Sequence, residues 1–316
     1  MDYSDAGVDI EASDSAVDAL ADELQVDHGD YAGLIQIDDR VFGLTTDGVG
    51  TKILVAEALD DYSSIGIDCI AMNVNDLIAM NLKPAAFVDY LVVEKPDEEL
   101  SREIGEGLAE GADQAGTRML GGETAVMPEV VEGVDLAGTC LGYAYPDDVV
   151  DGTDVVKGDL IVGFPSSGIH SNGLTLARKA VRRNYGYSDE APYDSRSIGE
   201  ELLEPTRIYT SALGVAEKYE VHGMAHITGG GYTNLSRISP HRYVVDDPLP
   251  IQPVFDFIKD QGNVDEREMY RTFNMGMGFV AVMPEEDAYD AVEETDAEAV
   301  GFVEEGDGVN VRGMEI

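Results

Sequence analysis

The sequence predicts a mixed α/β (α+β) protein with two domains. Its 316 residues are enough for one large or two ordinary domains, and a hydrophobic content of 44% is typical of a globular chain. Strand-like and helix-like segments alternate through the first half, until a turn-rich stretch, PDDVVDGTDVVKGDL (146–160), interrupts the pattern. We therefore predict one domain over residues 1–150 and a second over residues 151–316.

The first half shows the alternation clearly. AGLIQIDDRVFGLTTD (32–47) predicts a pair of strands. SIGIDCIAMNVNDLIAMN (64–81) has apolar residues at helical spacing and predicts a helix, which places Asn73 and Asp76 on one face. GGETA then comes directly after a second predicted helix. The remaining elements are a strand at 85–94, that helix at 99–120 and a strand at 134–145.

The second half contains two glycine-rich junctions between its predicted strands and helices. FPSSGIHSNG (164–173) follows a strand, and HITGGGYTN (226–234) precedes a helix start. The expected order is a strand at 159–168, a helix at 171–186, a helix near 205–219, an amphipathic piece at 254–262 and strands from 276 onward.

Acidic residues dominate the charge. The chain has 63 Asp and Glu against 20 Lys and Arg, a net charge of −43, spread along its whole length. We interpret this as a surface adapted to molar salt, where the Debye length falls to about 3 Å and self-repulsion is screened. A cationic partner is the alternative, and nucleic-acid binding is disfavoured. No apolar run approaches the ~18 residues of a membrane span and no signal peptide is recognisable, so we expect a cytoplasmic protein.

Three acids stand at the ends or polar faces of predicted elements. Asp47 follows a strand, Asp76 lies on the polar face of a helix, and Glu123 follows two glycines at a predicted helix end. Carboxylates of this kind, together with phosphate oxygens, are the ligands that a nucleotide-bound Mg²⁺ ion prefers. Because the chain has 63 acids, a solvated surface position is the competing interpretation for each.

TTDGVGTK (45–52) contains the components of a phosphate-binding loop. Gly48 and Gly50 free the backbone, Thr51 can donate a hydrogen bond, and Lys52 can neutralise a phosphate. The stretch lacks the GxxxxGK[ST] order of a Walker loop, and its Asp-Gly pair is equally typical of a hairpin turn.

The two glycine-rich junctions are further candidates for anion binding, because unhindered N–H groups at a helix start attract anions. Tight turns and helix caps explain either junction alone, but two in one domain favour at least one phosphate site. His170, within the first junction, is either a catalytic group or a capping or core histidine.

Eight stretches occur in one order along the chain: YSDAGVDI, TTDGVGTK, IGIDCIAMNVNDL, LGGETAVMP, SSGIHSNG, PTRIY, AHITGGG and EMYRTFNMGMG. This series resembles the aminoimidazole ribonucleotide synthetases, or phosphoribosylformylglycinamidine cyclo-ligases, of purine biosynthesis, over essentially all 316 residues. The resemblance implies an enzyme that converts formylglycinamidine ribonucleotide and ATP to 5-aminoimidazole ribonucleotide, ADP and phosphate, by phosphorylating the amide oxygen and closing the ring.

The resemblance also implies roles for individual residues. Mg²⁺ would be bound by Asp47, Asp76 and Glu123. ATP would be bound by Asp47, Gly48, Gly50, Thr51, Lys52 and Asn73, with Lys52 facing the phosphates. The substrate would be bound by Ser167, Gly168, Gly229, Gly230 and Gly231. The catalytic residues would be His170, Lys52 and Asp76.

The same resemblance implies a quaternary arrangement. The N-terminal halves of two chains would pair in a homodimer to form a barrel-like sheet, with ATP near the interface. The C-terminal half would form a layered α/β sandwich.

Three departures from the family pattern are visible. Ser4 stands where the family often has lysine, the glycine-rich segment at 27–38 is short, and Val126 replaces a second acid in GGETA. The alternatives are thiamine-phosphate kinase, hydrogenase-maturation dehydratase, selenophosphate synthetase or a non-catalytic ligand-binding relative. The first 68 residues contain no cysteine, which disfavours selenophosphate synthetase, and PTRIY and EMYRTFNMGMG favour the cyclo-ligase.

Overall fold

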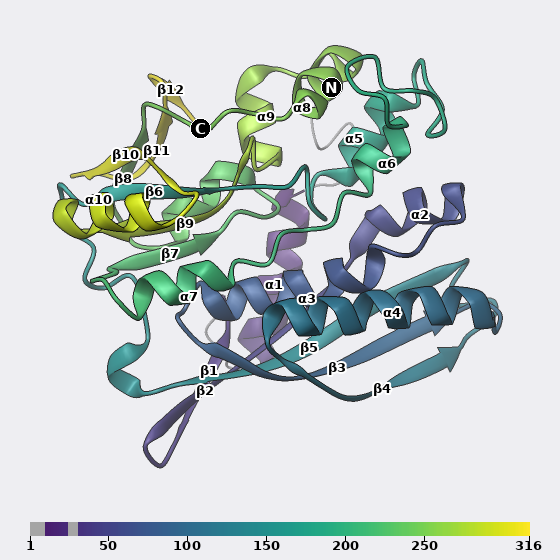
Figure 1. The fold of residues 1–316 in the computed structure, drawn as a ribbon, viewed down its shortest axis with the longest axis horizontal. Helices are drawn as coiled ribbons and strands as arrows, with labels where there is room; N and C mark the ends of the chain where they lie inside the picture. Colours follow the sequence, from purple (N-terminus) through teal and green to yellow (C-terminus); the bar gives the residue numbers. More distant parts are fainter. Residues whose placement is uncertain (1–9, 25–30) are drawn as a thin grey trace.

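The structure is a computed structural model that describes residues 10–24 and 31–316. The YSDAGVDI stretch with Ser4, and part of the short segment at 27–38, lie outside these residues. Two β-sheets organise the chain, and each is built from its own half of the sequence (Figure 1). No helix in the described part of the chain is long and apolar enough to cross a membrane.

The first sheet has five strands in the order β1-β2-β5-β3-β4. Neighbouring strands are antiparallel except β3 and β4, which are parallel and are joined through a helix. Along β5 the residues alternate between buried and less buried positions, because successive side chains of a strand point to opposite faces. The bounds are β1 Gly33–Ile37, β2 Arg40–Gly48, β3 Lys83–Val93, β4 Arg118–Val126 and β5 Val134–Ala144.

Two helices, α3 (Ile65–Ile78) and α4 (Glu98–Ala115), cover one face of this sheet, and the other face is turned away from them (Figure 1). Asp97 caps α4 by accepting hydrogen bonds from the N–H groups of Glu99 and Leu100. Gly116, in the left-handed region, ends the helix. The apolar spacing of both segments therefore predicted the helices correctly.

The helix predicted over 99–120 is too long. Helix α4 ends at Ala115, and Arg118–Val126, with Glu123 in it, forms strand β4. The strand forms because it pairs in parallel with β3 over eight residue pairs, from Ala86–Arg118 to Val93–Val126. Its own residues are mostly exposed and include two glycines, so the local sequence carries little strand signal.

The second sheet has seven strands in the order β12-β11-β8-β10-β6-β9-β7. Every residue of β9 is buried, as expected for a strand covered on both faces. The bounds are β6 Leu160–Pro165, β7 Gly223–His226, β8 Arg242–Val245, β9 Met277–Met283, β10 Glu298–Glu304, β11 Gly308–Val311 and β12 Met314–Glu315.

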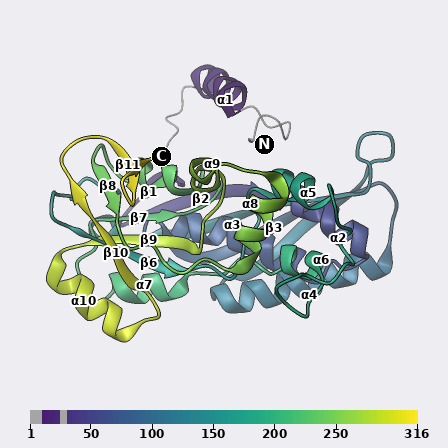
Figure 2. The ribbon, with the colours of Figure 1, turned by 90° about the horizontal axis from the view of Figure 1, so that it is seen from above.

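The remaining helices surround the second sheet and the space between the two sheets. Figure 1 shows α8 and α9 above the second sheet and α7 between it and the first, and Figure 2 shows α1 standing apart from both sheets. The α-helices are α1 Ile10–Leu24, α2 Ile53–Leu59, α5 Leu174–Val181, α6 Ile198–Leu202, α7 Thr210–Ala216, α8 Pro253–Gly262, α9 Glu266–Thr272 and α10 Glu285–Glu294. The 3₁₀ helices are η1 Gly50–Lys52, η2 Pro146–Asp148 and η3 Gly231–Arg237.

Candidate active site

Helix α3 is the element on which the candidate site is built. Its apolar side chains pack on the first sheet, so its polar side chains must face elsewhere. Asp68, Met72, Asn75 and Asp76 follow one another at intervals of four, three and one residues, which places them along one side of the helix. That side meets the C-terminal half of the chain, and the candidate site therefore lies between the two halves.

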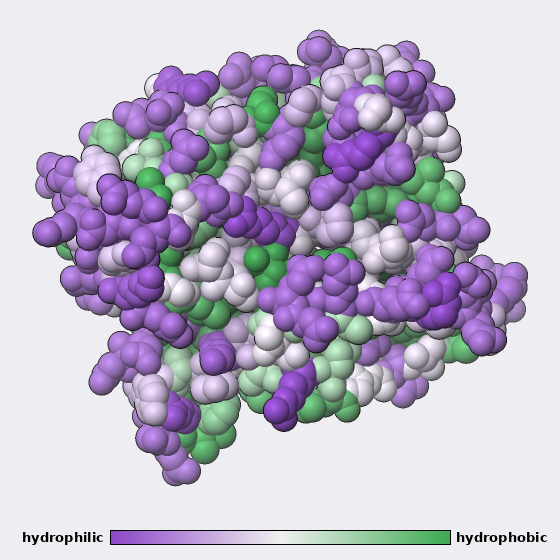
Figure 3. All heavy atoms as spheres, viewed as in Figure 1, coloured by the Kyte–Doolittle hydropathy of each residue, from purple (hydrophilic) through white to green (hydrophobic). Residues whose placement is uncertain are grey.

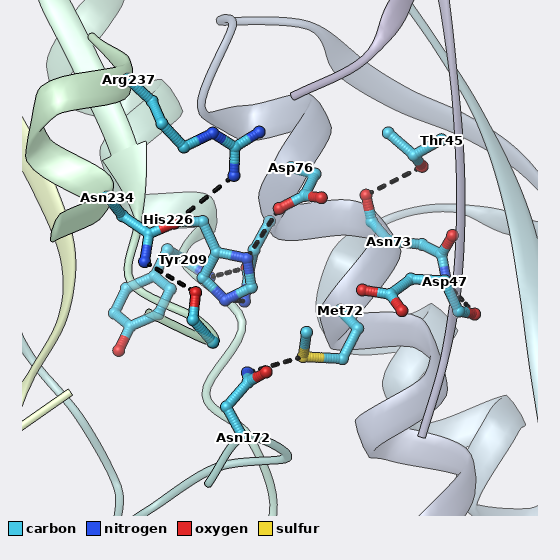
Figure 4. A network of polar contacts seen from close by, with 12 residues as sticks. Thr45, Asp47, Met72, Asn73, Asp76, Asn172, Tyr209, His226, Asn234 and Arg237 are labelled. Carbon is cyan, nitrogen blue, oxygen red and sulfur yellow. Dashed lines mark hydrogen bonds and ion pairs between the residues drawn. The ribbon is translucent and has the colours of Figure 1, made fainter. Parts of the chain in front are cut away.

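Asp47 is at the end of β2, beside α3 (Figure 4). Its carboxylate accepts a hydrogen bond of 2.7 Å from the N–H of Gly48. The Asn73 amide donates to the carbonyl of Asp47 at 3.1 Å, and the Thr45 hydroxyl donates to the carbonyl of Asn73 at 3.1 Å. These bonds fix the position of the strand end against the helix. The Oδ1 atom of Asn73 is buried and has no hydrogen-bond partner.

The Asp47 and Asp76 carboxylates interact electrostatically. Burial, and next the negative charge of Asp76, raise the pKa of Asp47 to about 6. Two carboxylates held near one another with a buried amide oxygen attract a cation, since a cation removes their mutual repulsion.

His226, at the end of β7, is a site residue that the sequence analysis did not select. Its Nδ1 atom lies 2.8 Å from the Asp76 carboxylate, and its Nε2 atom lies 3.4 Å from the Asn75 amide (Figure 4). The ring is completely buried. The contact joins α3 to the second sheet across 150 residues of sequence. The available signal was its place three residues before the first glycine of HITGGG.

The two glycine-rich junctions lie side by side at α3. The Asn172 amide oxygen is 3.5 Å from the position that a Cβ atom would take at Gly229. The Asn172 amide nitrogen contacts the Met72 sulfur of α3 at 3.7 Å. Gly231 has a φ of +55°, and an added Cβ atom would stand 2.2 Å from the carbonyl oxygen of Tyr270, so only glycine fits there.

The first junction is held by hydrogen bonds within the C-terminal half. The Ser167 hydroxyl donates to the carbonyl of Pro205 at 2.6 Å, and the Asn274 amide donates to the carbonyl of Gly168 at 2.8 Å. Gly168 and the Ser167 backbone therefore stay in place beside the second junction. TTDGVGTK forms the end of β2, the turn at Val49 and η1, and so is a strand-to-helix junction rather than a hairpin. The Thr51 hydroxyl lies 3.0 Å from that of Thr175.

Lys52, which the resemblance places beside the ATP phosphates, contacts an aspartate in the structure. Its side chain is completely buried, and its ammonium lies 2.9 and 2.8 Å from the two carboxylate oxygens of Asp68. It also donates to the carbonyl of Glu204 at 2.6 Å. Lys52 and Asp68 form a buried ion pair, and removing one partner of such a pair costs several kcal/mol. The phosphate contact of Lys52 stays a prediction.

His170, for which the sequence leaves a catalytic and a core role open, lies in the interior of the C-terminal half. The ring is 1% exposed and packs near Tyr209, with ring centroids 6.3 Å apart. Its Nε2 atom accepts the N–H of Ser167 at 3.2 Å. Burial lowers the pKa of His170 well below its usual value, so the ring is neutral. His170 thus supports the turn of the first junction from inside.

Glu123 does not join Asp47 and Asp76. In the strand register Glu123 pairs with Tyr90, on the face of the sheet opposite to Asp47, because side chains alternate along β4. Two further strands, β5 and β3, separate β4 from β2. In the described parts of the chain, 10–24 and 31–316, no three His, Cys, Asp or Glu side chains converge to hold a metal ion. Within the described residues of one chain, Glu123 therefore lies apart from Asp47 and Asp76.

The GGET motif has a different structural role. Gly122 pairs with Asp89, and a Cβ atom at Gly122 would stand 2.2 Å from the Asp89 carboxylate. Asp89, Gly138 and Asp47 form one row across the sheet, on the face that α3 covers. Gly122 thus leaves room for a carboxylate, Asp89, that the sequence analysis missed and that points to the same side as Asp47.

Family comparisons match most of the chain. Residues 29–144 match the N-terminal domain of AIR synthase related proteins, and residues 156–313 match the C-terminal domain of the same proteins. The phosphoribosylformylglycinamidine cyclo-ligase of Methanosarcina mazei is 47% identical over 328 aligned positions, which cover 100% of this chain and 98% of that protein. The cyclo-ligase of Pyrococcus horikoshii is 46% identical, over 93% of this chain and 91% of that protein.

Solved structures of related proteins share the fold. Thiamine monophosphate kinase from Aquifex aeolicus, in a complex with AMPPCP and TMP, superposes with a TM-score of 0.69 at 20% identity, covering 95% of this chain and 93% of that chain. PurL from T. maritima, in a complex with FGAR, gives 0.64 at 18% identity, over 92% of this chain and 47% of that chain. At such identities the likeness shows the fold alone, a mixed α/β fold with two domains.

The identity to the archaeal relatives is more than twice that to the kinase, and it extends over the full length of both chains. The aligned positions span the strand end with Asp47, the α3 face and both glycine-rich junctions, which the structure brings together. This chain is a member of the phosphoribosylformylglycinamidine cyclo-ligase family.

Proposed function

We propose that this enzyme closes the imidazole ring of 5-aminoimidazole ribonucleotide, using formylglycinamidine ribonucleotide and ATP and releasing ADP and phosphate. The observation that carries the proposal is the meeting of the Asp47–Asp76 pair with both glycine-rich junctions at α3. An acidic pair fits a nucleotide with its metal ion, and glycine-rich backbone beside it fits phosphate and ribose groups.

The reaction needs an activated amide oxygen, because that oxygen is a poor leaving group. Phosphorylation by ATP makes it a good one, and the neighbouring amidine nitrogen then attacks the carbon and expels phosphate. Such a phosphoryl transfer requires mainly positioning and charge neutralisation from the protein. The chain supplies positioning through Gly48, Gly50 and Thr51 on the nucleotide side. On the substrate side the groups are Ser167, Gly168, Gly229, Gly230 and Gly231.

The residues present fit a divalent cation. Asp47 and Asp76 approach one another, and the buried Oδ1 of Asn73 has no hydrogen-bond partner. These three side chains would hold Mg²⁺, which would neutralise the charge on the ATP phosphates. His226 holds the Asp76 carboxylate from the other side, and this fixes the direction in which Asp76 faces the site.

The proposed activity is tested by phosphate release. With Mg²⁺ and KCl, the purified protein is expected to release phosphate from ATP only when formylglycinamidine ribonucleotide is added, and to form one aminoimidazole product per phosphate. The measurement couples phosphate detection to colorimetric assay of the aminoimidazole.

Thiamine monophosphate serves as the control substrate, because the kinase with the same fold is the nearest alternative activity. Phosphate transfer to thiamine monophosphate, or ATP hydrolysis without any acceptor, would contradict the proposal. Absence of turnover with formylglycinamidine ribonucleotide over the whole range of salt concentrations would also contradict it.

The proposal includes a homodimer formed through the open face of the first sheet. Five large apolar side chains on this face are 42–57% exposed, which is unusual for a monomer surface. The strand register places them all on the side away from α3. Leu44 pairs with Gly33, two residues before Ile35, and Thr46, two residues after Leu44, pairs with Thr139, which pairs with Val88. The five side chains are Ile35, Ile37, Leu44, Val88 and Tyr90. Two copies related by a two-fold axis would cover this patch.

The dimer is tested by sedimentation. The wild-type protein is expected to sediment at twice the mass of its 34.0 kDa chain. The Val88→Glu variant is expected to sediment as a monomer, because a charge at the covered patch is costly to bury. Val156→Glu, at another exposed valine outside this patch, is the matched control and should remain dimeric. A monomeric wild-type protein would contradict the arrangement.

Residues 1–150 and 151–316 are the proposed limits of the two domains. The last strand of the first sheet ends at Ala144 and the first of the second begins at Leu160, which supports a boundary in the turn-rich connection. Limited proteolysis is expected to cut the chain first within residues 146–159. Resistance of this segment, with cleavage elsewhere, would contradict a domain boundary between residues 150 and 151.

A further inference from the structure

Residues 205–209, the PTRIY stretch, connect α6 to α7 without regular secondary structure and lie along the polar side of α3. The helix predicted near 205–219 begins only at Thr210, as α7. We call residues 205–209 the strap. Two side chains of α3 form hydrogen bonds with the strap, at two separate places.

The first place is Asp68, which is completely buried. One oxygen of its carboxylate accepts hydrogen bonds from the backbone N–H of Thr206 at 2.8 Å and from the Thr206 hydroxyl at 2.6 Å. Lys52 neutralises the carboxylate and binds the carbonyl of Glu204, just before the strap. Bonds of this kind, with a charged acceptor in a dry interior, are stronger and more directional than neutral ones.

The second place is Asn75. Its amide nitrogen donates to the carbonyl of Arg207 at 2.9 Å, and its amide oxygen accepts the N–H of Tyr209 at 3.0 Å. Seven residues of helix separate Asp68 from Asn75, a rise of about 10.5 Å. Three residues of chain, the interval from Thr206 to Tyr209, can span up to about 10 Å. The two contact points therefore match in spacing, and the strap cannot slide along α3 without losing both.

The other side of the strap holds the substrate-side junction. The Thr206 hydroxyl lies 3.2 Å from the Ser171 hydroxyl, and the carbonyl of Pro205 accepts the Ser167 hydroxyl at 2.6 Å. The Arg207 guanidinium donates to the carbonyl of Pro165 at 3.1 Å and to both Asp296 oxygens at 2.7 and 2.9 Å. The Thr206 hydroxyl is thus a bridge from α3 to the SSGIHSNG junction.

From these contacts we infer that Asp68, Asn75 and Thr206 are positioning residues, which act through the strap to set the place of Asp76 relative to the glycine-rich junctions. Asp76 follows Asn75 directly in α3 and is held from the other side by His226. The strap therefore sets the position of the metal-and-nucleotide side of the site, with Asp76, relative to the substrate side, with the glycine-rich junctions. This inference rests on the proposed function, because register matters only if the two sides act on one reaction.

Thr206→Val tests the inference with little change of shape. It removes the hydroxyl that bridges Asp68 and Ser171 and keeps the backbone N–H bond. We expect kcat to fall about 10-fold or more while the KM for ATP changes less than about 2-fold, since a misplacement of about 1 Å is enough for such a loss. Thr206→Ser, which keeps the hydroxyl, is expected to restore kcat to near the wild-type value.

Thr153→Val is the matched control for a merely structural effect. Its hydroxyl donates a hydrogen bond of 2.6 Å to the Asp151 carboxylate in the connection between the two sheets. This variant is expected to lose melting temperature and to keep the wild-type kcat.

A second measurement does not depend on activity. Amide hydrogen exchange over residues 73–78, the end of α3, is expected to speed up in Thr206→Val and to stay unchanged in Thr153→Val. A wild-type protein without turnover would contradict the proposed function. The exchange measurement would still test whether the strap positions the end of α3. A Thr206→Val protein with wild-type kcat and wild-type exchange at 73–78 would overturn the inference.

Discussion

Replacing Asp76 by asparagine is expected to lower substrate-dependent ATP turnover at least about 100-fold while leaving the fold intact. The asparagine oxygen can still accept the Nδ1–H of His226, so the link between α3 and the second sheet is kept. What is lost is the negative charge that would hold Mg²⁺ beside Asp47. Steady-state kinetics at several Mg²⁺ concentrations measure the effect, and circular dichroism checks the fold. The loss should be smaller at high Mg²⁺.

Asp159→Asn is a closely matched control for this prediction. Asp159 also accepts a hydrogen bond from a histidine. Its Oδ2 atom lies 2.8 Å from the Nδ1 atom of His222. This pair lies at the start of β6, and it is separate from both glycine-rich junctions. Its loss is expected to lower the melting temperature without a comparable loss of kcat. Wild-type turnover in Asp76→Asn would remove Asp76 from the proposed metal site.

Stability is expected to rise steeply with salt. The melting temperature in about 2 M KCl should exceed that in about 0.1 M KCl by at least about 10 °C, because the net charge of −43 repels itself unless it is screened. Figure 3 shows hydrophilic residues over most of the face that it draws. The measurement is thermal unfolding followed by circular dichroism across a KCl series.

Two controls separate screening from other effects of concentrated solutes. Sucrose stabilises by exclusion without screening charge, so it should not reproduce the KCl effect. The double variant Glu110→Gln/Asp113→Asn removes two exposed acids near the C-terminus of α4, where negative charge is unfavourable. It should raise the melting temperature in low salt more than in high salt. Equal melting temperatures in low and high KCl would contradict the interpretation of the charge as an adaptation to salt.

Prediction from sequence succeeded where short-range pattern decides structure. The α3 helix follows from apolar residues at helical spacing, and it forms because that spacing places them on the sheet. Strand β4 was missed because its stability comes from pairing with β3 rather than from its own residues. The PTRIY stretch was assigned to a helix because nothing local shows that its backbone groups bind Asp68 and Asn75 instead.

The residues of the site divide in the same way. Asp47 and Asp76 could be selected as acids at element ends, and the structure brings them together. The partners of Lys52 could not be predicted, because they lie 16 and 152 residues away. His226 was missed because its contact with Asp76 spans 150 residues. The separation of Glu123 from Asp47 follows only from strand alternation and register.

The sequence by itself determined the family, the mixed α/β class and most of the polar residues around the site, because ordered motifs and local periodicity are written along the chain. Only the tertiary structure decided which of these polar groups are paired with other groups in the protein interior. The reason is that burial and pairing depend on contacts between distant segments. Lys52 illustrates this. The glycine-rich loop beside it suggests a phosphate ligand, and only the tertiary structure shows that the lysine forms a buried ion pair with Asp68.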